Sequence, residues 1–426
     1  MLFFNNKEKN LSWSRLDNAA KIFPSTVEKS DTRVFRFSCE LCCDVDREIL
    51  QQAAQSAAES FPGFGAVMKK GLFWYYLERC DDKIKVTEEN LPVCAALYEE
   101  DRPGLLYRVS YLKNRINLEM FHVLTDGTGA LELLKAIVYR YLITAFPEKF
   151  GENLPFLESG ASFSQKSADS FSKYYDSSVK GKNRVKYVKA FKLRYDRLDN
   201  NGMSVIEGFA SVKSVIEAAH RYNTTLTVYL AALYIKALSM EMPLSGKRRP
   251  VVINIPVNLR PYFPSETAKN FFGMISVAYR FDRQPEDIDS IAAYVKDSFE
   301  QQLTKENLAV RMNSLASLEH NPIARIAPLP LKNEVLKIAR HIGLKSETSV
   351  ISNVGRIKMP KEFDGLIRRF SVIVSTQNIQ LNICSYNDCL QMGITSSYAS
   401  SDVQRSFFRL LTEQGIEVTV RSNDSY

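Results

Sequence analysis

The chain has 426 residues, of which 45% are hydrophobic and 24% charged, and its formal net charge is +8. This composition argues against a disordered protein, and the length predicts two domains. No run of about eighteen apolar residues is present, and the first residues lack a basic region followed by a long apolar one. We therefore expect no membrane-spanning helix and no secretory signal, and predict a cytoplasmic location.

The first part of the chain alternates between strand-like and helix-like patterns, which predicts an α/β arrangement. Strands are predicted over residues 33–43, 69–77, 105–111 and 116–122. Helices are predicted over 46–60, with an acidic cap at Asp44 or Asp46, and from 129 to about 146, where Pro147 stops the helix.

Residues 151–176 are rich in Ser and Gly, and the chain is basic from Lys173 to Arg197. We predict an N-terminal domain over 1–175, a basic linker over 176–200 and a C-terminal domain over 201–426. The basic segment is compatible with a solvated surface or with binding a phosphorylated cofactor or an acidic carrier protein. No nucleic-acid-binding motif accompanies it, so we expect no nucleic-acid partner.

The second half shows the same mixture of patterns. Helices are predicted over 212–220, 226–237, 287–303, 308–318 and from the capping-box pattern at Ser401 to Gly415. Strands are predicted over 203–210, 251–257 and 271–281, followed by three successive antiparallel strands over 369–375, 379–386 and 390–398.

The seven cysteines are odd in number and lie mainly in strand-like segments, which suits reduced core thiols better than a disulfide framework. Cys39, Cys42 and Cys43 are close in sequence, but no second cluster of Cys or His follows them. We therefore predict no metal site.

The stretch from Ile116 to Gly129 concentrates the candidate chemistry. Alternation places His122 at the end of a row of core-facing apolar side chains, with Phe121 on the other face. Burial disfavours imidazolium, so His122 is expected to be neutral and able to accept a proton. The alternative is a core histidine with a purely structural hydrogen bond. Asp126-Gly127-Thr128-Gly129 favours a turn that leads into a helix, and we attribute Gly127 to the backbone of that turn.

His122-x-x-x-Asp126-Gly127, between a strand and a helix, resembles the H-H-x-x-x-D-G motif of the chloramphenicol acetyltransferase-like superfamily, which includes condensation domains and alcohol O-acetyltransferases. Three further segments occur in the expected order, and together with a segment near the start of the chain they look most like bacterial alcohol O-acetyltransferases. These segments are Arg15 to Ala20, Val257-Asn258-Leu259-Arg260, Asn270-Phe271-Phe272-Gly273 and Ser352-Asn353-Val354-Gly355. Phe121 replaces the first histidine of the motif, a change that would reshape the acceptor pocket without necessarily abolishing activity.

The resemblance implies two chloramphenicol acetyltransferase-like domains, each a mixed β-sheet with packed helices, and an active-site tunnel at their interface. It implies that His122 is the general base and that Asp126 is a structural and orienting residue paired with Arg260. By position in the family pattern, Ser352, Asn353 and Gly355 are candidate donors to the oxyanion, although Asn-x-Gly is also a common turn composition.

We therefore predict an acyl-CoA-dependent O-acyltransferase of the alcohol acetyltransferase kind. It would transfer an acyl group, with acetyl-CoA the expected co-substrate, directly to a small alcohol or other hydroxyl acceptor, without a permanently bound cofactor. Two alternatives are a condensation-type enzyme that takes the acyl group from a carrier protein, and a catalytically silent binding or scaffold protein. Lys247, Arg248 and Arg249 are candidates to contact coenzyme A phosphates, or form a solubilising turn.

Overall fold

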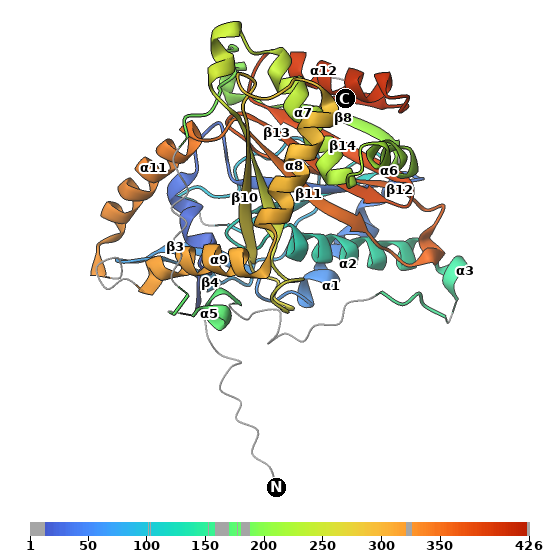
Figure 1. Cartoon of the computed structure of the whole chain (residues 1–426). Helices are drawn as coiled ribbons and strands as arrows, with labels where there is room; N and C mark the ends of the chain where they lie inside the picture. Colours follow the sequence, from blue (N-terminus) through green and yellow to red (C-terminus); the bar gives the residue numbers. More distant parts are fainter. Residues whose placement is uncertain are drawn as a thin grey trace.

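The computed structural model describes residues 13–100, 102, 104–151, 153–157, 170–176, 178–179, 188–320 and 326–423. The described residues form an α/β structure with three sheets and helices packed around them (Figure 1). The α/β fold with mixed sheets is therefore confirmed. Among these residues, no helix combines the length and the apolar character needed to cross a membrane.

A five-stranded sheet contains the segment that ends at His122. Its strands, in spatial order, are β12 (Ile367–Val374), β2 (Val34–Leu41), β7 (Arg115–Phe121), β6 (Tyr107–Leu112) and β5 (Thr87–Glu88). Helices α1 (Arg47–Glu59) and α2 (Gly127–Ala145) pack against each other beside this sheet. The Asp46 side chain accepts a hydrogen bond from the backbone N–H of Ile49, 2.9 Å away, which confirms the predicted acidic cap.

Strand β7 is buried on both faces, whereas alternation predicted one core-facing row. Glu119, on the face opposite Met120, is 0% exposed. Its carboxylate pairs with Arg36, with Nη2 and Oε1 2.8 Å apart, and with Arg108. Because these ion pairs compensate a buried charge, a polar residue in the pattern does not mark a solvent-facing position here.

A seven-stranded mixed sheet forms the second large layer. Its strands, in spatial order, are β10 (Phe272–Tyr279), β9 (Val251–Asn258), β11 (Ser349–Ile357), β13 (Ile379–Tyr386), β14 (Cys389–Ser396), β8 (Ser204–Ser211) and β15 (Thr419–Ser422). Its helices are α6 (Val212–Arg221), α7 (Leu226–Met240), α8 (Ile288–Gln302), α9 (Lys305–His320) and α12 (Asp402–Glu413). α7 is buried along most of its length and packs against α6, α8 and α12.

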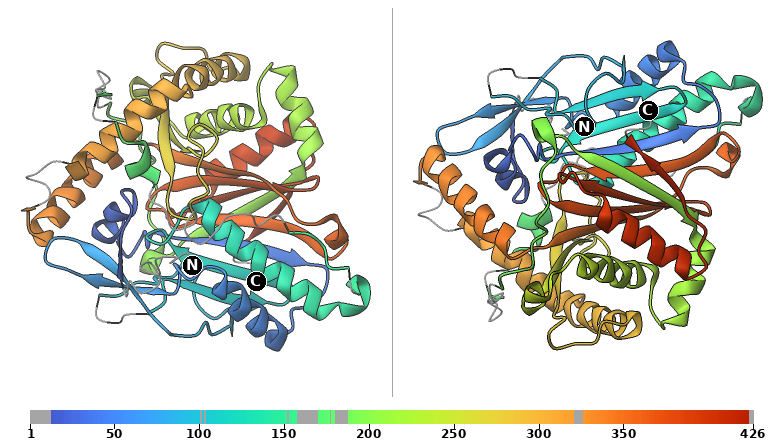
Figure 2. Two further views of the ribbon diagram at one scale, coloured as in Figure 1. Left: turned by 90° about the horizontal axis from the view of Figure 1, so that it is seen from below. Right: turned by 90° about the horizontal axis from the view of Figure 1, so that it is seen from above.

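β12 crosses from the second half of the chain into the five-stranded sheet. It pairs antiparallel with β2, so that Val372 lies opposite Phe37, and Figure 2 shows the orange β12 among the blue and cyan strands. The predicted pairing of β13 with β14 is confirmed, but the expectation that β12 pairs with β13 is wrong. A strand from the predicted C-terminal domain thus belongs to the sheet of the predicted N-terminal domain. The domain boundaries given above stay a prediction from the sequence.

Other local differences follow from turns and short elements. The strand predicted over 69–77 is two strands, β3 (Ala66–Lys70) and β4 (Tyr75–Arg79), which form a third sheet with β1 (Trp13–Arg15). The long helix α11 (Leu329–Lys345) was not predicted. Short helices are α3 (Pro147–Phe150), α5 (Ser170–Tyr174) and the 3-10 segments Ala20–Ile22, Pro24–Thr26, Asp199–Asn201, Leu244–Arg248 and Lys361–Phe363.

The capping box at the last helix does not form as predicted. Ser401 makes no side-chain cap bond; instead the Asp402 N–H donates to Ser400 Oγ at 3.1 Å. Gln404 does not return the second bond of the motif, since neither polar atom of its buried side chain has a hydrogen-bond partner among the described residues.

Part of the predicted linker is docked on the second sheet. The Ala190 N–H donates to Lys345 O and the Phe191 N–H to Pro250 O, at 3.0 and 2.8 Å. Lys180, Lys182, Arg184 and Lys186 lie outside the described residues.

Candidate active site

His122 follows the last residue of β7 and is held by backbone and aromatic contacts. Its N–H donates to Arg33 O, 3.0 Å away, just before β2. Its ring stacks on Phe23, with ring centroids 4.7 Å apart, and lies 4.6 Å from Phe35. Phe272, on β10, contacts it from the other sheet with centroids 6.1 Å apart. The imidazole therefore occupies an aromatic setting built by both sheets.

The charge state of His122 follows from this setting. Burial lowers the pKa of the imidazole below its usual value of 6.5, while the hydrogen bond from the imidazole to Asn270 Oδ1 and the charge of Asp126 oppose this effect. His122 as a whole residue is half-buried. The lowered pKa favours the neutral ring near pH 7.

Asn270 contacts His122, and Asp17 in turn contacts Asn270. Asn270 Oδ1 lies 3.3 Å from His122 Nδ1, and Asn270 Nδ2 donates to His122 O at 3.1 Å. The same Nδ2 donates to Asp17 Oδ2 at 3.0 Å, and Asp17 Oδ1 accepts the N–H of Ala20 at 2.7 Å. Both side chains are buried, at 1% and 3% exposure. The sequence placed both residues in the segments that carry the resemblance but gave neither a role.

Asp126 makes its contacts away from the imidazole. Its Oδ1 accepts the N–H groups of Thr128 and Gly129, so it is the N-cap of α2. Its Oδ2 accepts the Phe271 N–H and pairs with Arg260 Nη1, each at 2.8 Å. The predicted partners Asp126 and Arg260 are therefore in contact, and the orienting role of this pair stays a prediction.

The glycine that α2 requires at its start is Gly129, not Gly127. A Cβ on Gly127 would meet Phe37 at 3.6 Å, an ordinary contact, and its φ is not positive. A Cβ on Gly129 would overlap Thr125 Oγ1 and Ala268 O. The explanation of Gly127 by turn conformation is therefore wrong, and close backbone approach to Ala268 explains the second glycine instead.

The Ser352 to Gly355 segment lies in strand β11 and bulges between Asn353 and Gly355. Asn353 Oδ1 accepts the Gly355 N–H, and its Nδ2 donates to Thr227 Oγ1, both at 2.8 Å. The Gly355 N–H, one candidate oxyanion donor, is therefore already used in the bulge. Val354 reaches the start of α2, since its Cγ2 would lie 4.0 Å from a Cβ at Gly127. Ser352 is half-buried, and its role as a donor stays a prediction.

Phe121 does not share the face of His122. It is 0% exposed and stacks on Tyr98, with ring centroids 5.9 Å apart. The substitution of the first motif histidine thus fills the core beneath the sheet, and a direct effect on an acceptor at His122 does not follow from its position.

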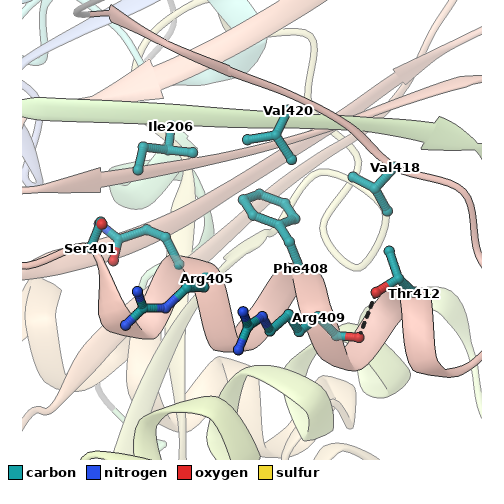
Figure 3. A pocket seen from close by; sticks show the side chains of 9 residues that line it. Ile206, Ser401, Arg405, Phe408, Arg409, Thr412, Val418 and Val420 are labelled. Carbon is teal, nitrogen blue, oxygen red and sulfur yellow. Dashed lines mark hydrogen bonds between the residues drawn. The ribbon is translucent and has the colours of Figure 1, made fainter.

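Two other features lie apart from these residues. Lys247 forms an ion pair with Glu286, which holds the basic turn at residues 247–249 near the start of α8. A surface hollow of about 330 Å³ is lined by residues of α12, β8 and β15, and Phe408 projects from α12 toward Val420 of β15 (Figure 3). None of the predicted site residues lines this hollow.

Comparison with known proteins yields matches at the level of structure alone. No family model matches the sequence, and no curated protein matches it. Polyketide synthase associated protein 5 from Mycobacterium tuberculosis superposes with a TM-score of 0.61 at 14% identity, over 93% of this chain and 96% of that one. F. graminearum TRI101, complexed with coenzyme A and deoxynivalenol, has a TM-score of 0.65 at 11% identity, over 96% and 100%.

The first condensation domain of the CDA synthetase superposes with a TM-score of 0.64 at 13% identity, over 96% of this chain and 97% of that one. At these identities the likeness establishes the fold. The chain therefore has the two-domain fold of chloramphenicol acetyltransferase-like and condensation domains, as the resemblance predicted.

Proposed function

We propose that this protein is an acyl-CoA-dependent O-acyltransferase of the alcohol acetyltransferase kind in which His122 is the general base. The observation that carries the proposal is a buried imidazole with a lowered pKa, whose ring is held by aromatic contacts and whose Nδ1 faces Asn270. A hydroxyl group is a poor nucleophile near neutral pH, and a positioned neutral imidazole is suited to remove its proton.

The proposed reaction needs no acyl-enzyme intermediate. His122 takes the proton of the acceptor hydroxyl as its oxygen attacks the thioester carbonyl carbon. The tetrahedral oxyanion then collapses, the C–S bond breaks, and the imidazolium returns the proton to the departing sulfur. The products are an ester and a free thiol, and His122 is neutral again.

Two solved structures with this fold support coenzyme A as the carrier of the acyl group. TRI101 is complexed with coenzyme A, and a mutant of the starter condensation domain of the rhizomide synthetase RzmA is in complex with C8-CoA and Leu-SNAC. The second of these also keeps the condensation-type alternative in view, so the test must distinguish a coenzyme A donor from an acyl carrier protein.

The experiment measures thiol release by the purified protein from acetyl-CoA and octanoyl-CoA in the presence of a panel of alcohols. We expect His122→Ala to lower kcat by roughly 10²–10⁴-fold, the usual contribution of a general base. His341→Ala is the matched control, because His341 is exposed on α11. Its rate should equal that of the wild type, and circular dichroism should show that both variants fold.

Three results separate the alternatives. Activity with coenzyme A thioesters that survives His122→Ala would overturn the role of His122. Turnover only with an acylated carrier protein would replace the proposal by the condensation-type reaction. Tight binding of acyl-CoA without turnover of any acceptor would favour a binding protein.

A further inference from the structure

The amide of Asn270 has an orientation that its partners determine. Its Nδ2 faces Asp17 Oδ2 and His122 O, at 3.0 and 3.1 Å. A carboxylate and a backbone carbonyl only accept hydrogen bonds, so the group between them must be the NH₂ and not the carbonyl oxygen. In a flipped amide, the carbonyl oxygen of Asn270 would face Asp17 Oδ2 and His122 O, and the lone pairs would repel each other in a buried site. Only one orientation of the amide is therefore favourable.

The opposite end of this amide then determines the tautomer of His122. With Nδ2 directed at Asp17, the carbonyl oxygen Oδ1 lies 3.3 Å from His122 Nδ1. Amide oxygen can only accept, so Nδ1 must carry a hydrogen. In the other tautomer two lone pairs would face each other.

We propose that Asp17 and Asn270 are positioning residues that hold His122 in the tautomer protonated on Nδ1, so that Nε2 is the basic nitrogen. The assignment of the tautomer rests on the geometry alone, and the use of Nε2 as the base rests on the proposed function. The two residues join three parts of the chain, since Asp17 follows β1, His122 follows β7 and Asn270 precedes β10.

The arrangement resists rearrangement because its members are buried and have further partners. Asp17 Oδ1 accepts the Ala20 N–H at 2.7 Å, and Asp17 Oδ2 also accepts the Asn270 N–H at 3.2 Å. The adjacent Phe271 N–H donates to Asp126, so the backbone on both sides of the amide is fixed. Rotating Asn270 would leave buried donors and acceptors without partners, which is unfavourable.

An amide at this position has a chemical consequence that a carboxylate would not share. When Nε2 accepts the proton of the hydroxyl, the ring becomes cationic and the bond from Nδ1 to Asn270 becomes charge-assisted and stronger. The amide oxygen does not take up a proton near neutral pH. The transferred proton therefore stays on Nε2, where it can be returned to the departing sulfur.

The test reads the tautomer directly by NMR of protein labelled with ¹⁵N-histidine. The chain has four histidines, and the spectrum of His122→Ala identifies the signals of His122. At neutral pH we expect a pyrrole-type shift for Nδ1 and a pyridine-type shift for Nε2 in the wild type. A protonated Nε2 in the wild type would overturn the proposal, and this measurement requires neither turnover nor a variant of the two positioning residues.

Two variants test whether the positioning residues cause the preference. Asn270→Ala should convert His122 to a mixture of tautomers and lower kcat at least tenfold, by less than removal of the base, with KM changed less than twofold. Asp17→Asn preserves size but can present its own NH₂ to Asn270, so it should give an intermediate mixture. Asn382→Ala, which removes a buried amide from β13, is the control and should leave the His122 signals unchanged.

The outcomes distinguish this inference from the proposed function. If both variants retain the wild-type tautomer, Asp17 and Asn270 do not set it and the inference fails. If the tautomer changes as expected but no donor is turned over by the wild type, the positioning holds and the proposed function fails.

Discussion

Arg260 and Asp126 form a two-point contact between the large sheets: Nη1 lies 2.8 Å from Oδ2, and Nη2 lies 3.2 Å from Oδ1. Arg260 follows β9 of the seven-stranded sheet, and Asp126 caps the helix after β7 of the five-stranded one. The same guanidinium donates to the backbone oxygens of Thr267 and Lys269, at 2.9 and 2.8 Å. The pair therefore fixes the start of α2 against the segment that presents Asn270.

We expect Asp126→Ala to destabilise the protein by about 3–5 kcal/mol, because it leaves the largely buried guanidinium of Arg260 without its counter-ion. The loss of the cap on α2 contributes about 1 kcal/mol to this change. The free energy of unfolding, measured by urea denaturation, is the readout, and a lower yield of folded protein should accompany it.

Arg260→Met on the Asp126→Ala background provides the control for the unpaired charge. The double variant should be more stable than Asp126→Ala alone, because no uncompensated guanidinium remains. A wild-type denaturation midpoint for Asp126→Ala would refute the structural role of this carboxylate.

The lowered pKa of His122 predicts the shape of the pH–rate profile. Since burial moves the pKa below 6.5, the neutral base predominates at pH 7, and kcat/KM should be flat there. As the pH falls through the lowered pKa, the imidazole gains a proton and the rate should fall with it. An acidic limb centred at pH 7 or above would contradict this environment for the ring.

The lowered pKa of His122 also makes the free energy of unfolding depend on pH. In the unfolded chain His122 is no longer buried and regains its usual pKa of 6.5. Below that pH, unfolding is therefore accompanied by protonation of His122. The contribution of this group is therefore complete above pH 6.5 and decreases as the pH falls toward the folded-state pKa. His122→Ala should show a weaker loss of stability than the wild type in that window.

Sequence periodicity predicted the helices and strands whose buried residues follow a regular pattern. It failed where the structure depends on contacts between residues far apart in the sequence. The helix from Asp46 and the strands β13 and β14 are set by local alternation and capping, and the sequence located them. The pairing of β12 with β2 depends on contacts between segments more than 300 residues apart, which no local pattern encodes. Likewise, the burial of Glu119 could not be predicted, because the arginines that compensate its charge are brought to it by the pairing of strands.

The site shows the same division. His122 and Asp126 were identified by their spacing and resemblance, because strand, turn and helix place them locally. The function of Asn270 could not be predicted, since it depends on an amide orientation set by Asp17, 253 residues away. The sequence does not distinguish Gly127 from Gly129. Only the position of Ala268 in the structure shows that Gly129 is the one with no room for a side chain.

Glu40 extends the connection made by β12 and offers a test of it. Its Oε2 lies 2.7 Å from Arg369 Nε of β12 and 3.2 Å from Arg421 Nη1 of β15, so one carboxylate links both sheets. Although burial opposes ionisation, the hydrogen bond and charge of Arg369 lower the pKa of Glu40 below 4.5. We expect Glu40→Gln to reduce the free energy of unfolding by about 1–3 kcal/mol at pH 7.

The pH dependence and a neighbouring residue supply the controls for this prediction. Because the folded-state pKa is lowered, the contribution of Glu40 is present above pH 4.5 and is lost below it, so the two proteins should converge in acid. Arg368 also contacts Glu40, at 3.3 Å, but its side chain is 54% exposed. Arg368→Ala should therefore change stability by less than about 1 kcal/mol. An equal effect of both substitutions would contradict a special role for the buried contact.

Gly129 and Gly127 provide a matched pair at the start of α2. In Gly129→Ala the new methyl group would overlap Thr125 Oγ1 and Ala268 O, and the backbone oxygen cannot move without shifting the segment before Asn270. We expect a loss of about 1–3 kcal/mol in stability together with lower activity, because overpacking here displaces the contacts of His122. Gly127→Ala meets only Phe37 at 3.6 Å and should be neutral or stabilising by up to about 1 kcal/mol. Thermal denaturation and thiol-release rates measured on both variants decide the matter, and equal melting temperatures would mean that α2 can move away from Ala268 at no cost.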